Sequence, residues 1–358
     1  MACTEDPSVG LPERPYRGPQ AAADSPLYVH YPEIDLRIAR LDPRSGAVRA
    51  LLYPDLWHAD TRAVRDFALD ETRLFALLST HDPVADATLF VADLQDGQLE
   101  DRIALPAAPR VLGWGSAGQL LVGHFTSQEH RGYLSVVDTQ NLRPLTQVAL
   151  QGSCISVTAD GADAYAIERV ECRGAKDGPF AIYRLVHIDL DRGTVKRRLE
   201  LPAGARQVVI GPTGLLYVSH ASGVGLHASD GTLSVVDALR WTLVDRVRLD
   251  MIVRHIEVTP DRLVLNMLSR SGEAWFSVLR PDHSTLYDFR FDELVTGELA
   301  VIGSQAFVPQ RGQNGLLRVQ MSPGPRVDRL AARPKVPYSD RPGLLRTVVA
   351  RRGVTDAH

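Results

Sequence analysis

Short apolar stretches alternate with polar turns along most of the chain, and one phrase among them repeats. Residues 134–138 and residues 233–237 both read LSVVD, and looser copies end at Asp42, Asp93 and Asp189. The aspartates that close the five copies are spaced by 51, 45, 51 and 48 positions. A period of roughly 40–50 residues built from short strands is typical of propeller blades. The pattern therefore predicts an all-β propeller.

Seven pairs of apolar strands can be placed with this period, each pair forming the second (B) and third (C) strand of a blade. The pairs are 27–30 with 36–41, 74–79 with 88–93, 120–124 with 133–138, 164–168 with 183–189, 216–220 with 232–237, 263–267 with 275–279, and 306–309 with 316–319. The fold predicted is a seven-bladed β-propeller of four-stranded antiparallel blades.

The first blade lacks an innermost strand (A) in this scheme. The segment Leu344–Ala350 (LLRTVVA) supplies one, so the ring is expected to close through a C-terminal strand. The propeller then occupies residues 27–353, and the polar, Pro-rich residues 1–26 form a flexible tether. The outermost strands (D) are polar, as in VKRRLEL, which suits an edge that faces water. The closing aspartates precede the C–D turns and are predicted to cap them, not to bind a metal.

The charge balance and the hydrophobic runs exclude several classes of protein. The chain has 358 residues, with 40 basic and 43 acidic residues and a net charge of -3. A nucleic-acid-binding surface would need a basic excess, so none is expected. No run of 18 apolar residues is present that would span a membrane. A protein of this length can bury a large core, and we expect a monomer without a metal or another cofactor.

The N-terminus suggests export. Its start, MACTEDP, resembles the mature end of a bacterial lipoprotein, in which a small residue precedes an acylated cysteine. The resemblance implies lipidation of Cys3 and an extracytoplasmic, periplasmic or outer-surface, location. The alternative is a chance sequence at the true start of a cytoplasmic protein.

Residues 215–250 (LLYVSHASGVGLHASDGTLSVVDALRWTLVDRVRLD) resemble the YVTN family of bacterial β-propeller repeats. Tyr217–His220 stands for the YVTN strand, and residues 233–237 stand for the VSVID strand that follows. The resemblance is architectural: it implies a seven-bladed, often extracytoplasmic propeller and assigns no reaction.

Two sets of polar residues recur at one mouth of the central channel, where propellers bind ligands. Arginines begin the A strands, and polar residues end the B strands. The arginines are Arg65, Arg110, Arg206 and Arg254, and the others are His30, His124, Glu168, His220, Asn266 and Gln310. Guanidinium groups bind carboxylates or phosphates through a planar fork, so the sets predict a site for a polar or anionic ligand. The alternative is structural: the arginines pair with acidic residues of neighbouring blades, and the strand ends satisfy loop backbone.

Two of the three cysteines lie in the fourth predicted blade. Cys154 begins strand A of the fourth blade and Cys172 lies in its long B–C connection, so a disulfide is expected, the alternative being two unrelated thiols.

No GxSxG or HExxH motif occurs. We therefore expect a non-enzymatic propeller that presents its mouth to a protein partner or a small anionic ligand. Two alternatives remain, a lactonase-like hydrolase and the propeller subunit of a quinoprotein- or cytochrome-linked redox complex.

Overall fold

A computed structural model describes residues 25–31, 37–52, 63–79, 87–106, 109–115, 118–125, 132–173, 179–220, 231–269, 271–291, 298–310, 316–321, 325–330 and 347–350. The predicted lipidation site Cys3 and nearly all of the predicted tether lie outside these residues. The described part contains no helix that is long and apolar enough to cross a membrane.

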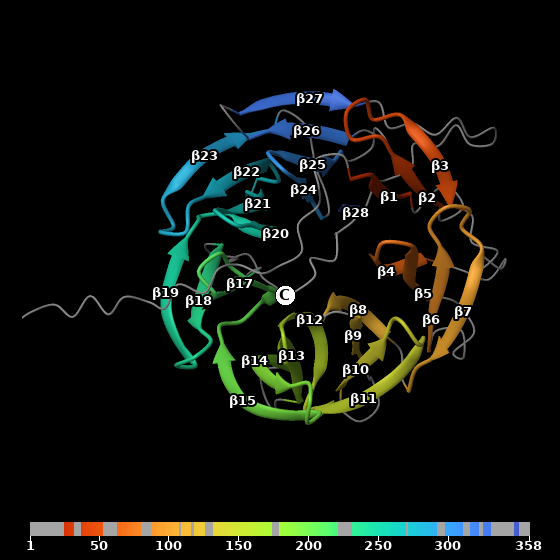
Figure 1. Ribbon diagram of the computed structural model, residues 1–358. Coiled ribbons are helices and arrows are strands. Elements are labelled where there is room, and N and C mark those ends of the chain that lie inside the picture. Colours follow the sequence, from red (N-terminus) through yellow and green to blue (C-terminus); the bar gives the residue numbers. More distant parts are fainter. Residues whose placement is uncertain are drawn as a thin grey trace, which may run out of the picture.

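Seven four-stranded antiparallel sheets surround a central axis, as the sequence predicts (Figure 1). Each is a blade with strands A to D from the centre outward. Blade 1 consists of β28 (Thr347–Ala350), β1 (Leu27–Tyr31), β2 (Arg37–Leu41) and β3 (Val48–Leu52). Blade 2 consists of β4 (Ala63–Leu69), β5 (Arg73–Ser79), β6 (Thr88–Asp93) and β7 (Leu99–Ala104). Blade 3 consists of β8 (Pro109–Trp114), β9 (Gln119–His124), β10 (Gly132–Asp138) and β11 (Arg143–Leu150).

Blades 4 to 7 follow the same order around the ring. They are β12 (Ser153–Asp160), β13 (Asp163–Arg173), β14 (Pro179–Asp189) and β15 (Thr194–Leu201); β16 (Ala205–Ile210), β17 (Leu216–His220), β18 (Thr232–Asp237) and β19 (Thr242–Arg248); β20 (Ile252–Thr259), β21 (Arg262–Leu268), β22 (Ala274–Leu279) and β23 (Thr285–Arg290); β24 (Ala300–Ile302), β25 (Gln305–Pro309), β26 (Leu316–Gln320) and β27 (Arg326–Leu330).

The ring closes through the C-terminal strand. β28 pairs antiparallel with β1, with Leu27 opposite Ala350 and His30 opposite Thr347. The predicted closure is therefore confirmed. This pairing joins the two ends of the described chain in one sheet, so blade 1 needs both ends to complete its four strands.

The hydrophobic core lies between neighbouring blades. All five residues of β17 are buried, whereas β19, the outer strand of the same blade, alternates between exposed and half-buried residues. Strands B and C are covered on both faces and are therefore nearly continuous apolar runs, which explains the repeated LSVVD phrase. Phe75 of blade 2 and Leu120 of blade 3, for example, belong to one buried cluster.

The aspartates that end strand C cap the C–D turns, as predicted. Asp138 Oδ1 accepts hydrogen bonds from the backbone N–H groups of Gln140, at 2.9 Å, and Asn141, at 3.0 Å. Asp42, Asp93, Asp189 and Asp237 accept equivalent bonds from the residues that follow them. These carboxylates therefore stabilise the C–D turns.

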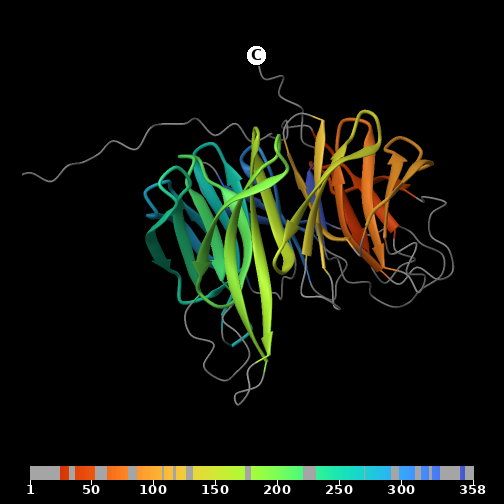
Figure 2. The ribbon, with the colours of Figure 1, turned by 90° about the horizontal axis from the view of Figure 1, so that it is seen from below.

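Blade 4 departs from the prediction. The segment expected to be a loop after Glu168 continues β13 and β14 as a long hairpin, which projects beyond the other blades (Figure 2). Cys154 lies opposite Glu168, and Cys172 lies four positions farther along β13, opposite Phe180. At about 3.3 Å per residue the two cysteines are roughly 13 Å apart, too far for a disulfide. The predicted disulfide is wrong, and Cys154 is a free, buried thiol.

Candidate functional site

The four predicted arginines occupy one equivalent position in four blades. In β4, β8, β16 and β20 the pairing with strand B skips one residue, and the skipped residues are Arg65, Arg110, Arg206 and Arg254. Such a β-bulge leaves one residue unpaired and re-aims its side chain. All four side chains are exposed. Because neighbouring blades cover both faces of an inner strand, an exposed side chain there faces the channel mouth.

We call the end of the ring where strands A begin the mouth face, and the opposite end, with the C–D turns, the turn face. At the mouth face Arg206 lies close enough to Arg254 to affect its titration: burial lowers the pKa of Arg254, and the positive charge of Arg206 lowers it further. Neither guanidinium lies within ion-pair distance of a carboxylate in the part of the chain that the structure describes. The two arginines therefore place positive charge at the mouth that no carboxylate of the described residues pairs with.

The other two arginines lie side by side in blades 2 and 3. Arg65 donates from Nη1 to the carbonyl oxygen of Pro109 at 3.0 Å, directly before Arg110. The Arg110 guanidinium lies 5.2 Å from the centre of the Phe125 ring, a cation–π contact that keeps its charge. The mouth of the channel thus carries the four arginines that the sequence singled out.

In three of the five blades with a described inner bulge, the residue after the bulge ties one blade to the next. Asp66 Oδ2 accepts from the backbone N–H of Leu112 at 2.7 Å. Ser156 Oγ accepts from Val208 N–H at 3.1 Å, and the Gln207 amide bonds both the N–H and the carbonyl of Ile256. The free edge of an inner strand has no strand partner, so these side chains satisfy backbone groups that would otherwise be unpaired. They fix the spacing of the blades directly below the arginines.

Below the arginines the channel becomes acidic. Burial raises the pKa of Asp66 well above its ordinary value, and the nearby Glu298 raises it further. The pKa of Glu298 is also raised, because the surrounding protein makes the charged form less favourable. The positive charge of His255 opposes this rise, and the negative charge of Glu257 adds to it. His255 Nε2 lies 3.5 Å from Glu257 Oε2. A raised pKa favours the neutral form of a carboxyl group, so Asp66 and Glu298 carry less negative charge than ordinary surface carboxylates.

The histidines predicted at the mouth are buried inside the blades. His124 is 0% exposed and its Nε2 lies 2.9 Å from Ser135 Oγ, while His220 is 3% exposed and its Nε2 lies 2.9 Å from Ser234 Oγ. Both serines are the second residue of an LSVVD phrase. Each histidine thus pairs with the serine of a repeat phrase, and both are buried, whereas the sequence predicted them to lie open at the mouth.

Glu168 and Asn266 are also buried. Glu168 Oε2 accepts from the backbone N–H of Gln151 at 2.7 Å. Its Oε1 lies 3.7 Å from Arg184 Nη1 and 3.5 Å from Arg198 Nε, so two cations of its own blade neutralise it. Asn266 pairs with His255 inside blade 6. Neither side chain is available to a ligand, because the strand ends turn into the interfaces between blades and not toward the channel.

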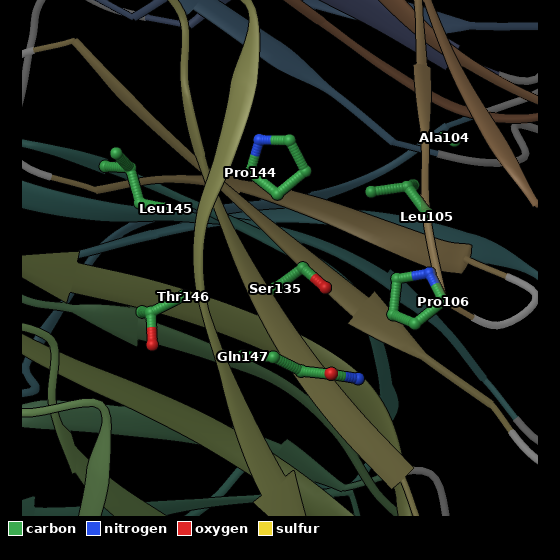
Figure 3. Close-up of a pocket in the computed structure, with 8 residues that line it drawn as sticks. All are labelled: Ala104, Leu105, Pro106, Ser135, Pro144, Leu145, Thr146 and Gln147. Carbon is green, nitrogen blue, oxygen red and sulfur yellow. The ribbon is translucent and has the colours of Figure 1, made fainter.

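A shallow surface pocket of about 480 Å³ lies elsewhere, on the outer rim between blades 2 and 3 (Figure 3). It is lined by Ala104, Leu105, Pro106, Ser135, Pro144, Leu145, Thr146 and Gln147. The lining contains no ionisable side chain, and Ser135 already bonds His124. Within the described ranges, no three His, Cys, Asp or Glu residues are close enough to hold a metal ion.

The channel acids were missed by sequence reasoning. The signal was present in the dipeptides Arg65–Asp66, Arg206–Gln207 and Arg254–His255, where a polar residue follows three of the four mouth arginines. In a regular strand, neighbouring residues point to opposite faces, so such a pair suggests one side chain at the mouth and one between blades. The bulge was needed to show that both lie at the channel.

Comparison with known proteins shows the fold. The chain superposes on a protein of unknown function from Desulfotomaculum acetoxidans with a TM-score of 0.62 and 10% identity, over 92% of this chain and 99% of that one. The superposition on Kuenenia stuttgartiensis hydrazine synthase has a TM-score of 0.56 and 15% identity, over 72% of this chain and 76% of that one. The superposition on the dihydro-haem d1 dehydrogenase NirN, in complex with DHE, has a TM-score of 0.55 and 14% identity, over 97% of this chain and 78% of that one.

At sequence level nothing closer is found. No protein-family model matches the chain, and no curated protein matches it. The resemblance to YVTN repeats therefore stays a prediction, while the propeller fold is shared with proteins of different activity. Function has to be argued from the site itself.

Proposed function

We propose that this protein is a non-enzymatic binding propeller whose arginine-lined mouth holds a small anionic ligand. The observation that supports the proposal is the exposed arginine at the bulge of four inner strands, where Arg206 lies near Arg254 and neither pairs with a carboxylate of the described residues. Two like charges held near each other are unfavourable without a counter-charge, and a carboxylate or phosphate would remove that cost.

The scaffold favours binding over catalysis. The polar side chains below the arginines bond backbone groups of adjacent blades and hold the mouth rigid. The buried histidines already have serine partners and lie inside the blades. A rigid cationic mouth favours the binding of anions.

The test is isothermal titration of acetate, phosphate and citrate into the protein and into the double variant Arg206→Ala/Arg254→Ala. The matched control is Arg192→Ala/Arg240→Ala, which also removes two exposed arginines but from C–D turns on the turn face. We expect anion affinity to fall at least tenfold in the first variant only. Equal affinity in all three proteins would overturn the proposal.

A second candidate is the propeller subunit of a redox complex. It is favoured by the likeness in fold to hydrazine synthase and to a dihydro-haem d1 dehydrogenase. Protein isolated from its own cells would then carry or co-purify with a haem, visible as a Soret absorption band. Native protein without such a band would exclude this candidate for a haem-containing complex.

A further inference from the structure

The long hairpin of blade 4 carries a strand edge beyond the rest of its sheet. β12 begins at Ser153, which lies opposite Arg169 of β13. Beyond that pair, β13 and β14 continue as a two-stranded hairpin for four more residue pairs, the last of which is Arg173 opposite Pro179. Among the described strands, none pairs with this part of β13 on the side away from β14. Such an edge presents backbone N–H and C=O groups to which a further strand can bind.

This edge faces the channel and lies on the mouth face. Strand A is the innermost strand of each blade, so the side of β13 that pairs with β12 is its inner side (Figure 1). Gly152, directly before β12, lies against the backbone of Arg169 and the side chain of Val170. The connection from blade 3 therefore covers the edge as far as Val170, and the open edge runs from Glu171 to Arg173.

Blade 4 also differs from its neighbours at the bulge. In β12 the pairing with β13 skips Ile155, at the position that Arg110 and Arg206 occupy in blades 3 and 5. Ile155 is half-buried and packs against an apolar cluster that contains Ile167 of β13 and Ala205, the residue before Arg206. The blade with the open edge thus has an apolar residue near the start of its inner strand, and an exposed arginine lies in the blade on each side.

Resting on the proposed function, we propose that the anionic ligand is an acidic segment of a partner protein, which binds in extended form as an added strand on the open edge of β13. Backbone hydrogen bonds to Glu171–Arg173 hold the segment, as in other complexes formed by strand addition. Its acidic side chains reach the arginines of the adjacent blades. Arg206 and Arg254 pair with no carboxylate of the described residues, so this charge complementarity favours an acidic segment over a neutral or basic one.

The test measures fluorescence polarisation of the labelled peptide TEVEVEVT and of two matched peptides. One is TQVQVQVT, which lacks the charges, and the other is TEVEVEVT with N-methyl groups on its central residues, which keeps the charges but cannot pair as a strand. We expect the unmodified acidic peptide to bind at least tenfold more tightly than either. The N-methyl comparison uses the wild-type protein, so it decides the question even if a variant does not fold.

The matching protein variant replaces residues 171–181 by Asn-Gly, which closes the hairpin with a two-residue turn after the pair Val170 and Ile182. It should lose at least tenfold in affinity for the acidic peptide and keep the wild-type affinity for phosphate. Arg206→Ala/Arg254→Ala should weaken the binding of both. Arg192→Ala/Arg240→Ala, on the turn face, should change neither.

The outcomes separate this inference from the proposal on which it rests. If phosphate binds through the arginines but the acidic peptide binds no more tightly than its N-methylated form, only the strand-addition inference is overturned. If neither phosphate nor the acidic peptide binds, both are overturned. If the peptide does not bind and the shortened hairpin converts a dimer to a monomer in sedimentation, the edge binds a second copy of the chain, which also overturns the inference.

Discussion

Protonation of His220 should make the fold strongly sensitive to mild acid. The imidazole is 3% exposed, and burial lowers its pKa from 6.5 to about 4; the carbonyls of Ala203 and Pro202 oppose the shift. The unfolded chain, in which the pKa is near 6.5, therefore binds a proton more readily than the folded chain. Stability is fully present above pH 6.5 and is lost as the pH falls toward 4.

The size of the effect follows from the two pKa values. Each unit by which the pKa of His220 differs between the folded and unfolded chain corresponds to about 1.36 kcal/mol, so the full loss of stability below pH 4 is roughly 3 kcal/mol. Between pH 7 and pH 5 the same linkage gives a loss of about 2 kcal/mol. That loss is a substantial fraction of the stability of an ordinary domain, which is about 5–15 kcal/mol.

The assay is urea unfolding between pH 4 and 7.5 for the wild type, His220→Gln and Ser234→Ala. His220→Gln cannot take up the proton, so its free energy of unfolding should fall less with acid, by about 2 kcal/mol at pH 5. Ser234→Ala removes the hydrogen-bond partner but keeps the imidazole, so it should keep the wild-type pH dependence. Parallel curves for the wild type and His220→Gln, or an imidazole that titrates near 6.5 by NMR, would refute the reasoning.

Three further predictions concern the ring and its turns. Ending the chain before Thr347 removes β28 and should abolish the cooperative thermal transition of the full chain; an unchanged melting curve would contradict the closure. Asp138→Ala should lower the free energy of unfolding by about 1 kcal/mol at neutral pH. Because its turn bonds lower the pKa of Asp138, that difference should vanish as the pH falls below 3.8, as urea titrations can show. Cys154 should react with a thiol reagent at least 100-fold more slowly in the native protein than in denaturant, since burial raises its pKa to about 12; rapid labelling would argue against burial.

The fold was predictable because its signals are local and repeated. Apolar runs mark strands B and C, which both neighbouring blades cover, and an aspartate marks each C–D turn. The C-terminal strand could be assigned because the first blade lacked a partner. The length of β13 and β14 could not, since the polar, Gly-containing segment that follows Glu168 also has the composition of a loop.

The site was predictable only in part. The arginines were found because they recur before apolar strands, but the histidines and Glu168 were misplaced. Pairing with strand B puts His124 opposite Pro109, directly before the bulge, and the side chain turns into the blade interface. A one-residue change of register reverses which face a strand residue occupies, and periodicity alone does not locate a bulge.

The outer strands provide an internal comparison for the mouth arginines. Six D strands also carry a bulge, and the skipped residues there are Arg49, Glu100, Leu145, Lys196, Val244 and Leu286. These positions are mixed in charge and include three apolar residues, so a bulge by itself imposes no charge on its side chain. The inner bulges, by contrast, carry arginine in four blades out of the five in which a bulge is described. Solvent exposure would be satisfied equally by acidic or neutral residues. The consistent choice of arginine therefore supports the proposal that an anion binds at the mouth.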